Sequence, residues 1–503
     1  MGEPWHRGLR WYPALFASLT PLYLAASNSG EYEWFELVLI VAFLVAISFI
    51  LYVAVHLLLR MRDRQDRAAA ITFVIVGWLF NSLLFLGVLG RALGVESIGR
   101  LRFAIPFGGL CVVTACWVIM RRRDATLDRG LSIFVTVLLV WSLGTLGWTT
   151  VKWRRWLEAG RLPATLTEPL EKEDSDTKAT DLPDVYLIVL DSYANGDLLR
   201  SRFGFSNRAF EDSLRRLGFT IPSAARSNYT HTAASLASFL NLDYVNDITT
   251  ATVPSKTLAF HYLIDRNRAA VFLKSLGYRF YFFPSSRFPG TRRSTLADVT
   301  FRAEGVGGFA MFMNQSVLAY AVWLATLPGR LVERLGFGPS GAQVELASAQ
   351  GLKRVVEQPG PKLVFAHFML THHPYYFDKH CNRSVAATGS FEEPHAYLAQ
   401  IECANELLLD IVTSVRIRNG RPAIIALQAD HGVGPFLKPG TGVPVSAPLS
   451  AERFAAFGAY YLPNGEAKAF GDTVTPVGAM RFIMQRYFDV NLQARANAGY
   501  WPW

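Results

Sequence analysis

The chain has 503 residues, of which 51% are hydrophobic and 18% are charged, and its formal net charge at pH 7 is +10. A soluble domain usually carries roughly 25% charged residues, so this composition indicates a membrane part joined to a water-soluble part. Four cysteines exclude a disulfide-dense scaffold and a zinc fold built on many cysteines.

Five long apolar runs lie near the N-terminus: Trp11–Ser27, Glu36–Leu59, Ala68–Leu89, Phe103–Met120 and Leu131–Val151. A helix needs about 20 apolar residues to cross the hydrocarbon core of a bilayer. The runs therefore predict a membrane domain of about five transmembrane helices over residues 1–151. The first run is interrupted by two prolines, and losing that helix would make the number of crossings even.

The arginines of this region are most frequent in alternate loops, although the third-to-fourth loop also holds Arg91, Arg100 and Arg102. The N-terminus holds Arg7 and Arg10, the second-to-third loop reads RMRDRQDR, and the fourth-to-fifth loop begins RRRD. The first-to-second loop has no Lys or Arg, so the positive-inside rule places the N-terminus in the cytoplasm and everything after Val151 outside. Residues 1–160 hold 16 Lys and Arg against 10 Asp and Glu. Much of the net positive charge therefore lies in the predicted cytoplasmic loops, where it sets the membrane orientation. This removes nucleic-acid binding from the candidate functions.

Residues 152–184 link the two parts. The stretch KWRRWLEAG suits an interfacial helix on lipid headgroups, or equally a plain helix end with aromatic anchors. A polar linker follows as far as Asp184.

The pattern over residues 185–503 predicts an extracytoplasmic α/β domain with a central, mostly parallel sheet, because short apolar runs alternate with helical periods. The predicted strands are Val185–Leu190, Arg279–Phe283, Lys362–Leu370, Ala423–Gln428 and Phe454–Tyr461. The predicted helices are Ala209–Leu217, Ala233–Leu240, Ala269–Leu276, Leu346–Val356 and Tyr397–Val415. Phe301–Leu327 has few charges and many aromatic residues, and it either faces the membrane or forms an insertion that packs on the core.

Acidic and imidazole side chains follow three of the predicted strands. Asp191 follows the first, His372 and His373 follow the strand at Lys362, and Asp430–His431 follows the strand at Ala423. Ligands of such sheets bind at the carboxyl ends of the strands. This set of donors suits a divalent ion, Zn²⁺ or Mn²⁺. Taken singly, an Asp in this position can be a helix N-cap and a DHG sequence can be a turn.

A hydroxyl group at a helix start supplies the possible chemistry. Thr230, His231 and Thr232 precede a helix of small residues. A threonine here is commonly an N-cap, but free N–H groups at a helix N-terminus also hold phosphate. A metal bound to the hydroxyl would lower its pKa and make it a nucleophile.

The sequences VLDSY, THTAAS, HFMLTHHPYYFD and QADHG, in this order, resemble the sulfatase-like branch of the alkaline-phosphatase superfamily. In architecture the chain resembles lipoteichoic acid synthases and lipid A phosphoethanolamine transferases, which join five membrane helices to an exported catalytic domain. The resemblance implies a threonine nucleophile at Thr232, a phosphate-binding His372, and a metal site. The implied metal ligands are Asp191, Thr232, Asp430 and His431; further substrate-binding candidates are His367, His373 and Thr230, the last also the second candidate for the nucleophile.

The sequence departs from these relatives in several places. Asp191 stands where the headgroup transferases have Glu, and GVGPFLKPGTG after the DH pair lacks their additional His. Only Cys381 and Cys403 lie in the exported part, where they could pair in an oxidising compartment. Ser223 is followed by AAR rather than the C/S-x-P-x-R pattern that sulfatases require, which argues against a sulfatase.

The expected function is metal-dependent transfer of a phosphoglycerol or phosphoethanolamine headgroup. The donor would be a phospholipid at the outer leaflet of a bacterial inner membrane, and the acceptor a glycan or a lipid. Two alternatives remain open, a phosphatase or phosphodiesterase that uses the same residues, and a non-catalytic sulfatase-like membrane protein.

Overall fold

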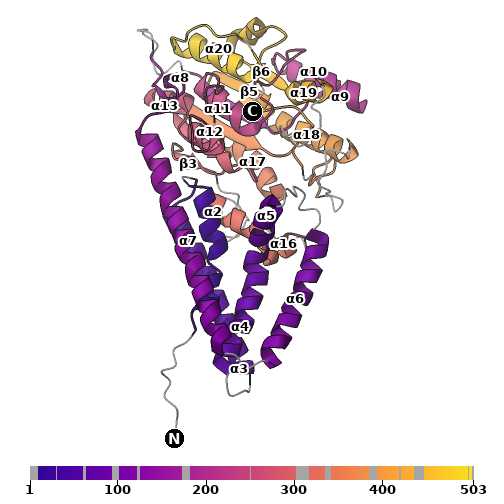
Figure 1. The fold of residues 1–503 in the computed structure, drawn as a ribbon. Coiled ribbons are helices and arrows are strands. Elements are labelled where there is room, and N and C mark those ends of the chain that lie inside the picture. The colour runs from indigo at the N-terminus through magenta and orange to yellow at the C-terminus, as the bar shows by residue number, and fades with distance from the viewer. Residues whose placement is uncertain are drawn as a thin grey trace. The chain divides into compact units, whose positions relative to one another are not determined.

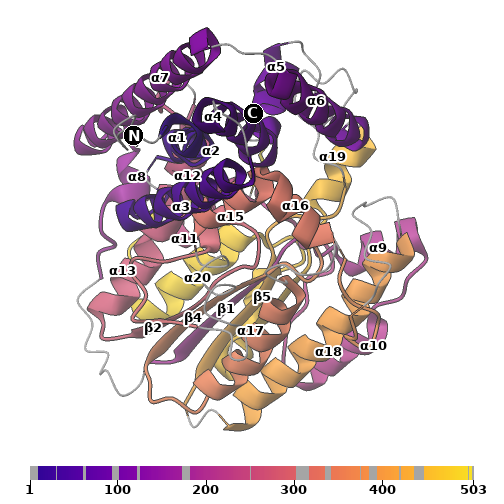
Figure 2. The same ribbon diagram turned by 90° about the horizontal axis from the view of Figure 1, so that it is seen from below.

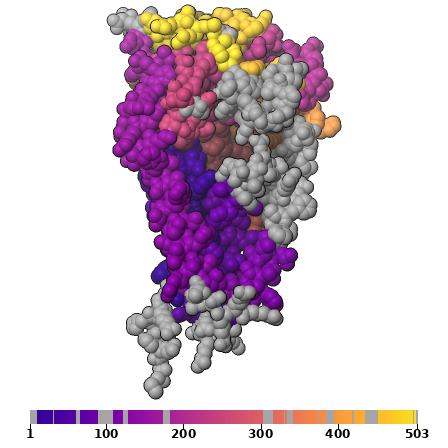
Figure 3. Space-filling model, viewed as in Figure 1, coloured from indigo at the N-terminus to yellow at the C-terminus, as the bar shows by residue number. Residues whose placement is uncertain are grey.

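A computed structural model describes residues 10–29, 31–59, 64–92, 101–121, 125–172, 182–249, 251–301, 316–334, 341–373, 375–383, 394–418, 421–434, 447–496 and 498–500, and Figure 3 draws the others in grey. The loops at 60–63 and 122–124, which carry part of the orientation argument, lie outside this set, as does most of GVGPFLKPGTG. Contacts divide the chain into two compact units, Met1–Glu158 with Ser316–Pro339, and Ala159–Gln315 with Ser340–Trp503. We call them, after the two parts expected from the sequence, the membrane unit and the enzyme unit. The boundaries predicted at residues 151 and 184 stay a prediction.

The membrane unit is helical (Figure 1). Its helices are α1 (Tyr12–Phe16), α2 (Leu19–Ser27), α3 (Trp34–Leu58), α4 (Arg64–Val76), the π-helical turn η1 (Gly77–Asn81), α5 (Ser82–Ala92), α6 (Leu101–Arg121), α7 (Ala125–Glu158), α15 (Val317–Ala325) and α16 (Leu327–Arg334). Among the described residues, three stretches are long and apolar enough to span a membrane: Trp34–Leu58, Gln65–Val88 and Leu127–Glu158. Gly108–Met120 is a shorter apolar helix, so the count of five spans stays a prediction.

The predicted first span is broken between α1 and α2, and a polar network covers the break. Asn81 of η1 donates from its side-chain amide to the carbonyl oxygen of Phe16 at 2.9 Å, and Thr20 donates to the carbonyl oxygen of Phe80 at 2.7 Å. Backbone groups at membrane depth need such partners because no water reaches them. The π-turn η1 therefore supplies the hydrogen-bond partners of the residues on either side of the break between α1 and α2.

Two ends of the bundle are marked by polar contacts. At one end, which we call the arginine end, Arg10 forms ion pairs with Asp66 at 3.1 Å and with Asp128 at 3.0 Å. At the other end, the serine end, the hydroxyl of Ser29 donates to Thr149 at 3.0 Å. The chain from α1 through α2 therefore runs from the arginine end to the serine end, and α7 runs in the same direction.

The stretch KWRRWLEAG is the end of α7, which continues without interruption to Glu158. Trp153 and Trp156 are buried, and their rings stack with centroids 4.9 Å apart. The stretch therefore continues α7 as far as Glu158, and the choice between an interfacial helix and a plain helix end stays a prediction.

The enzyme unit contains one six-stranded sheet in the order β3-β2-β4-β1-β5-β6. Its strands are β1 (Asp184–Leu190), β2 (Arg279–Phe283), β3 (Val299–Thr300), β4 (Lys362–Phe368), β5 (Ala423–Ala429) and β6 (Gly458–Tyr461). All neighbours are parallel except β5 and β6. The prediction of a mostly parallel sheet is confirmed. The last strand begins later than predicted, because helix α19 (Ala447–Phe454) occupies the predicted start.

Helices cover both faces of the sheet (Figure 2). The helices are α8 (Ala164–Thr167), α9 (Gly196–Phe203), α10 (Arg208–Arg216), α11 (Thr232–Asn241), α12 (Lys256–Asp265), α13 (Arg268–Ser275), α17 (Gly341–Val355), α18 (Pro394–Arg418), α19 and α20 (Pro476–Phe488). Helices α10, α17 and α18 lie over one face, and α11, α13 and α20 over the other. Every residue of β1, β4 and β5 is buried, as strands covered on both faces require. The packing on both faces therefore holds the carboxyl ends of β1, β4 and β5 in place.

Candidate metal centre and active site

The three central strands deliver acidic residues and histidines to one place. Leu190, at the end of β1, pairs with Phe368 of β4 and with Ala429 of β5. Asp191 follows directly, and its backbone N–H donates to the carbonyl oxygen of Phe368 at 2.9 Å. Asp191, Asp430 and His431 are all at most 3% exposed. The strand register therefore places the buried groups of adjacent strands side by side.

Ser192 joins the two aspartates through a strained backbone. Its φ of 63° lies in the left-handed region, which a residue with a Cβ atom adopts at a cost. In this conformation its N–H donates to Asp430 Oδ1 at 3.2 Å and its hydroxyl donates to Asp191 Oδ1 at 2.9 Å. The turn after β1 is thus shaped so that one residue holds both carboxylates.

Thr232, the first residue of α11, points its hydroxyl at this cluster. Its Oγ1 lies 3.3 Å from Asp191 Oδ2 and 3.2 Å from His431 Nε2. His231 precedes it in extended conformation, and burial lowers the pKa of His231 to about 4. The backbone carbonyl of Thr230 accepts a hydrogen bond from Arg453. Of the two candidate threonines, Thr232 is the one whose hydroxyl contacts Asp191 and His431.

Backbone carbonyls orient two of the histidines. Gly432 O lies 2.9 Å from His431 Nδ1, and His373 O lies 2.5 Å from His372 Nδ1. A carbonyl oxygen can only accept, so Nδ1 of each ring carries the proton. The Nε2 atoms lie 3.8 Å (His431) and 4.0 Å (His372) from Asp191 Oδ1. Both rings therefore present Nε2 to the carboxylate.

His367, on β4, belongs to the same cluster. Its Nε2 lies 3.5 Å from Asp191 Oδ2, and Thr291 Oγ1 lies 2.7 Å from its Nδ1. Asp191, His367 and Asp430 offer ligand atoms that all lie within 4.8 Å of one another. His367 was expected to bind substrate, and the geometry also makes it a candidate metal ligand. His373, another expected substrate-binding residue, is half-buried next to His372, with ring centroids 4.4 Å apart.

The electrostatics of the cluster fit a divalent cation. Burial by itself would raise the pKa of Asp191, but His372, His367 and His431 hold it well below its ordinary value. Burial and the charge of Asp191 raise the pKa of Asp430. Among the described residues, Asp430 Oδ2 and His367 Nε2 are buried without a hydrogen-bond partner. Two adjacent buried carboxylates and an imidazole are donors that suit Zn²⁺ or Mn²⁺.

A buried arginine holds the two loops of the site together. Arg453 of α19 donates to the carbonyl oxygen of Gly434 at 3.1 Å and to that of Thr230. Burial lowers the pKa of Arg453, while Asp430 and Asp191 act in the opposite direction. The guanidinium therefore links the loop that leads to Thr232 with the loop that follows His431.

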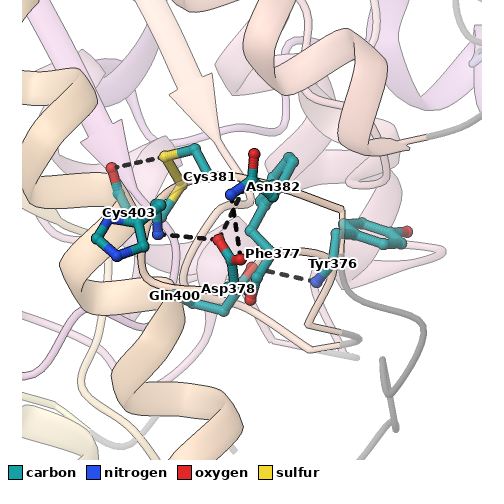
Figure 4. Close-up of a disulfide and its surroundings, with 8 residues drawn as sticks. Tyr376, Phe377, Asp378, Cys381, Asn382, Gln400 and Cys403 are labelled. Atoms are coloured by element: carbon teal, nitrogen blue, oxygen red, sulfur yellow. Dashed lines mark hydrogen bonds between the residues drawn. A yellow bond between two sulfur atoms is a disulfide. The ribbon is translucent and has the colours of Figure 1, made fainter.

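The segment after the two histidines is fixed to α18 (Figure 4). Cys381 and Cys403 form a disulfide, a pairing that the sequence left open. The side chain of Gln400 accepts from the N–H of Tyr376 at 3.2 Å and donates to the carbonyl oxygen of Phe377 at 2.5 Å. These bonds restrain the chain that leaves the site.

Sequence reasoning missed the supporting residues Ser192, Thr291, Glu345 and Arg453. Glu345 of α17 is buried and accepts from the hydroxyl of Ser286 at 2.5 Å and from the N–H of Met369 at 3.1 Å. Met369 follows β4, so Glu345 supports the chain just before His372. Ser192 lies inside the quoted VLDSY sequence, which is the only local signal that any of the four carries.

Comparisons with known proteins give structural neighbours only. Neither a protein-family model nor a curated protein matches the sequence. The lipooligosaccharide phosphoethanolamine transferase A (EptA) from Neisseria meningitidis is 10% identical, with a TM-score of 0.39, over 96% of this chain and 95% of that chain. The C-terminal periplasmic domain of EcEptC from Escherichia coli, in complex with Zn, is 14% identical with a TM-score of 0.39, over 64% of this chain and 85% of that chain. An alkaline phosphatase superfamily protein from Vibrio parahaemolyticus is 10% identical with a TM-score of 0.37, over 68% and 75% of the two chains.

Proposed function

We propose that this chain is a membrane-anchored transferase that moves a phospho-headgroup from a phospholipid donor to a glycan or lipid acceptor through Thr232. The headgroup would be of the phosphoethanolamine or phosphoglycerol kind. The observation that supports the proposal most strongly is the position of Thr232 Oγ1, 3.3 Å from Asp191 Oδ2 and 3.2 Å from His431 Nε2. The two acceptors draw the hydroxyl proton away from the face of the oxygen that would attack phosphorus. The N-terminus of α11 adds a partly positive environment that favours a phosphate group.

In the first step, Thr232 Oγ1 forms a bond to the donor phosphorus while the bond to the diacylglycerol oxygen breaks. The hydroxyl proton passes to Asp191 Oδ2, and the diacylglycerol oxygen takes a proton from His372. His372 suits this role because its side chain is 26% exposed at the edge of the otherwise buried cluster. Its Nδ1 is fixed by a carbonyl, so Nε2 is the atom that exchanges the proton.

In the second step, an acceptor hydroxyl takes the headgroup from Thr232. His372 Nε2 accepts the proton of the acceptor, the new phosphorus–oxygen bond forms, and the bond to Thr232 breaks. The threonine oxygen recovers its proton from Asp191. With water as the acceptor the same steps are hydrolysis, so acceptor choice separates a transferase from a phosphodiesterase.

The residues that would hold a metal are Asp191, Thr232, Asp430 and His431, with His367 in reach. A divalent ion, when bound there, lowers the pKa of a coordinated hydroxyl and neutralises charge on the phosphoryl oxygens. The protein groups that orient these ligands are Ser192 and Thr291, through the hydrogen bonds already described. In metal sites generally, hydrogen bonds from neighbouring groups hold the ligands in the orientation that the metal needs.

We place the enzyme unit outside the cytoplasm, at the inner membrane of a bacterium. The arginine end of the bundle holds Arg10 and adjoins the arginine-rich second-to-third loop, and the positive-inside rule assigns such an end to the cytoplasm. The chain leaves α7 at the serine end and enters the enzyme unit at Ala159. The disulfide between Cys381 and Cys403 fits the same placement, because disulfides persist in oxidising compartments.

The test is a search for the covalent intermediate. The full-length protein is incubated with phosphatidylethanolamine or with phosphatidylglycerol in the absence of acceptor, digested, and examined by peptide mass spectrometry. The expected result is a headgroup phosphate on Thr232, absent in Thr232→Ala. Thr230→Ala is the matched control and retains the adduct. Full activity of Thr232→Ala, or an adduct on Thr230, refutes the assignment of the nucleophile.

A lipid and glycan profile decides the acceptor. Cells that express the wild-type chain are compared with cells that express Thr232→Ala. A transferase produces a modified glycan or lipid together with diacylglycerol, whereas a hydrolase produces the free phosphorylated headgroup. The absence of both products, with an intact protein, would favour the non-catalytic alternative.

A further inference from the structure

Residues Ser316–Pro339 belong to the membrane unit although they lie, along the chain, inside the enzyme unit. They follow β3 and precede β4, two strands of the same sheet. The enzyme unit is therefore connected to the membrane unit at three points of the chain: once at the end of α7 and twice at the borders of this segment. The described part of the segment, residues 316–334, consists of helices α15 and α16, which we call the hairpin.

Helix α15 is apolar along its whole length. Its nine residues, VLAYAVWLA, include no charged side chain, and it contacts α2 and α3 of the bundle. At its start Ser316 donates its hydroxyl hydrogen to Glu36 at 2.8 Å and accepts from the N–H of Ala319 at 3.0 Å. Ser316 and Glu36 are 2% and 7% exposed. A buried carboxylate needs a donor, so this contact fixes where the hairpin meets α3.

Helix α16, with the sequence LPGRLVER, combines apolar residues with two arginines and one glutamate. It contacts the π-turn η1, whose last residue, Asn81, lies seven residues before Val88, where the apolar stretch ends. At 1.5 Å per residue this separation is about 10 Å, a third of a hydrocarbon core of about 30 Å. The chain direction puts this end of the span at the serine end, where Glu36 also lies, because α4 starts at the arginine end. The hairpin thus enters from the same end at which the chain passes into the enzyme unit.

The hairpin, like the bundle, has an exposed apolar side chain. Leu331 of α16 is 57% exposed. On α3, which α15 contacts, the side chains of Phe35, Val38 and Leu39 are exposed as well. A helix that spans a bilayer presents such side chains to acyl chains.

We propose that residues 316–334 form a re-entrant hairpin that inserts into the outer leaflet from the enzyme side, docks on α2, α3 and η1, and contacts lipid acyl chains through Leu331. The hairpin gives the enzyme unit a second membrane anchor besides α7. The docking holds for any reaction at the Thr232 site, because it depends only on the contacts of the membrane unit, whereas the outer leaflet follows from the proposed placement of the enzyme unit outside the cytoplasm.

Accessibility of single cysteines in the full chain tests the insertion. Cys111 and Cys116, the two free cysteines, are replaced by Ala, and Leu331→Cys or Val271→Cys is introduced. Val271 of α13 is the matched control, an apolar residue of the enzyme unit that is 42% exposed. Spheroplasts are treated with a membrane-impermeant maleimide. Because thiol labelling needs water, which the hydrocarbon core lacks, we expect position 331 to react on the order of tenfold more slowly than 271 and to react fully after denaturation in SDS.

Two outcomes of this labelling contradict the proposal. Equal labelling of positions 331 and 271 means that α16 lies in water. Labelling of 271 only after the membrane is opened means that the enzyme unit lies on the cytoplasmic side, and the hairpin would then not be in the outer leaflet.

Two further measurements identify what covers the hairpin. A bimane fluorophore on Leu331→Cys in reconstituted vesicles is expected to be quenched by lipids that carry a spin label in the acyl chain. Protection from maleimide without such quenching means that a protein surface, such as a second copy of the chain, covers α16, and it overturns the lipid contact. Glu36→Cys with Ser316→Cys is expected to form a disulfide on mild oxidation, detected by peptide mass spectrometry, and its absence in folded protein overturns the docking on α3.

Discussion

Replacing Glu345 by Gln changes one buried charge and keeps the shape of its surroundings. Glu345 is 2% exposed, and burial raises its pKa from 4.5 to about 7, against the hydrogen bonds from Ser286 and Met369. The folded pKa lies above the unfolded pKa of this acid, so ionisation in the folded state opposes folding. The cost is absent below about pH 4.5, grows between that pH and about 7, and is complete above it.

The size of the effect follows from the shift. One pKa unit corresponds to about 1.4 kcal/mol, so the ionised Glu345 lowers the free energy of unfolding by about 3 kcal/mol at pH 8. A glutamine stays neutral, can accept from the N–H of Met369 through its oxygen, and can donate to Ser286 through its amide. We therefore expect Glu345→Gln to be more stable than the wild type at pH 8, and to lose this advantage at pH 5.

The assay is thermal unfolding of the full chain in detergent at pH 5 and pH 8. With about 2 °C per kcal/mol for a domain of this size, the midpoint of Glu345→Gln should rise by about 6 °C at pH 8. Glu345→Leu is the control, because it removes both the charge and the acceptors and leaves the N–H of Met369 without its partner. It should be less stable than Glu345→Gln at both pH values. An equal difference between Glu345→Gln and wild type at pH 5 and pH 8 would refute the assignment of a buried, titrating carboxyl group.

Three more predictions concern the cluster at the strand ends. Metal at about 100 times its dissociation constant should stabilise the wild type by about 2.7 kcal/mol, and a chelator should remove this gain; in Asp430→Asn both effects should disappear, which metal analysis and thermal unfolding will show. Thr291→Val removes the hydroxyl that holds His367 and should weaken metal binding by about 10- to 100-fold, whereas Thr291→Ser should restore it; equal affinities in calorimetric titration of the two variants would contradict this role. Ser192→Gly should be more stable than Ser192→Ala by about 1 kcal/mol, since both lose the same hydroxyl and only glycine adopts the positive φ without strain; equal unfolding midpoints would show that the turn is not strained.

The sheet could be predicted because its central strands are mostly apolar. VYLIVL, KLVFAHF and AIIALQA are buried on both faces, and runs of this length bounded by polar residues are typical of parallel strands. The start of β6 was placed too early for a related reason. Phe454 is apolar, but it ends the amphipathic helix α19 rather than starting the strand, and a short apolar run does not distinguish the two.

The supporting residues could not be predicted because their partners are distant in the sequence. Thr291 contacts His367 across 76 positions, and Arg453 contacts Thr230 across 223. A threonine in a loop and an arginine in a short helix carry no local pattern that separates them from solvated residues. Glu345 lies in a helix of mixed composition, where an acid normally faces water; only the packing of α17 against the strands shows that it is buried.

The prediction of the metal cluster needed more than the rule that ligands bind at the carboxyl ends of parallel strands. Six strands spaced by about 4.8 Å make an edge about 24 Å wide, whereas the candidate ligand atoms of Asp191, His367 and Asp430 lie within 4.8 Å of one another. The rule places side chains on that edge without saying which of them meet. They meet because β4, β1 and β5 are neighbours at the centre of the sheet, although the chain makes β2 and β3 between β1 and β4. A list of strand ends does not contain this strand order. The sequence allowed the cluster to be predicted because the four motifs, in their order along the chain, resemble a superfamily whose metal ligands lie together.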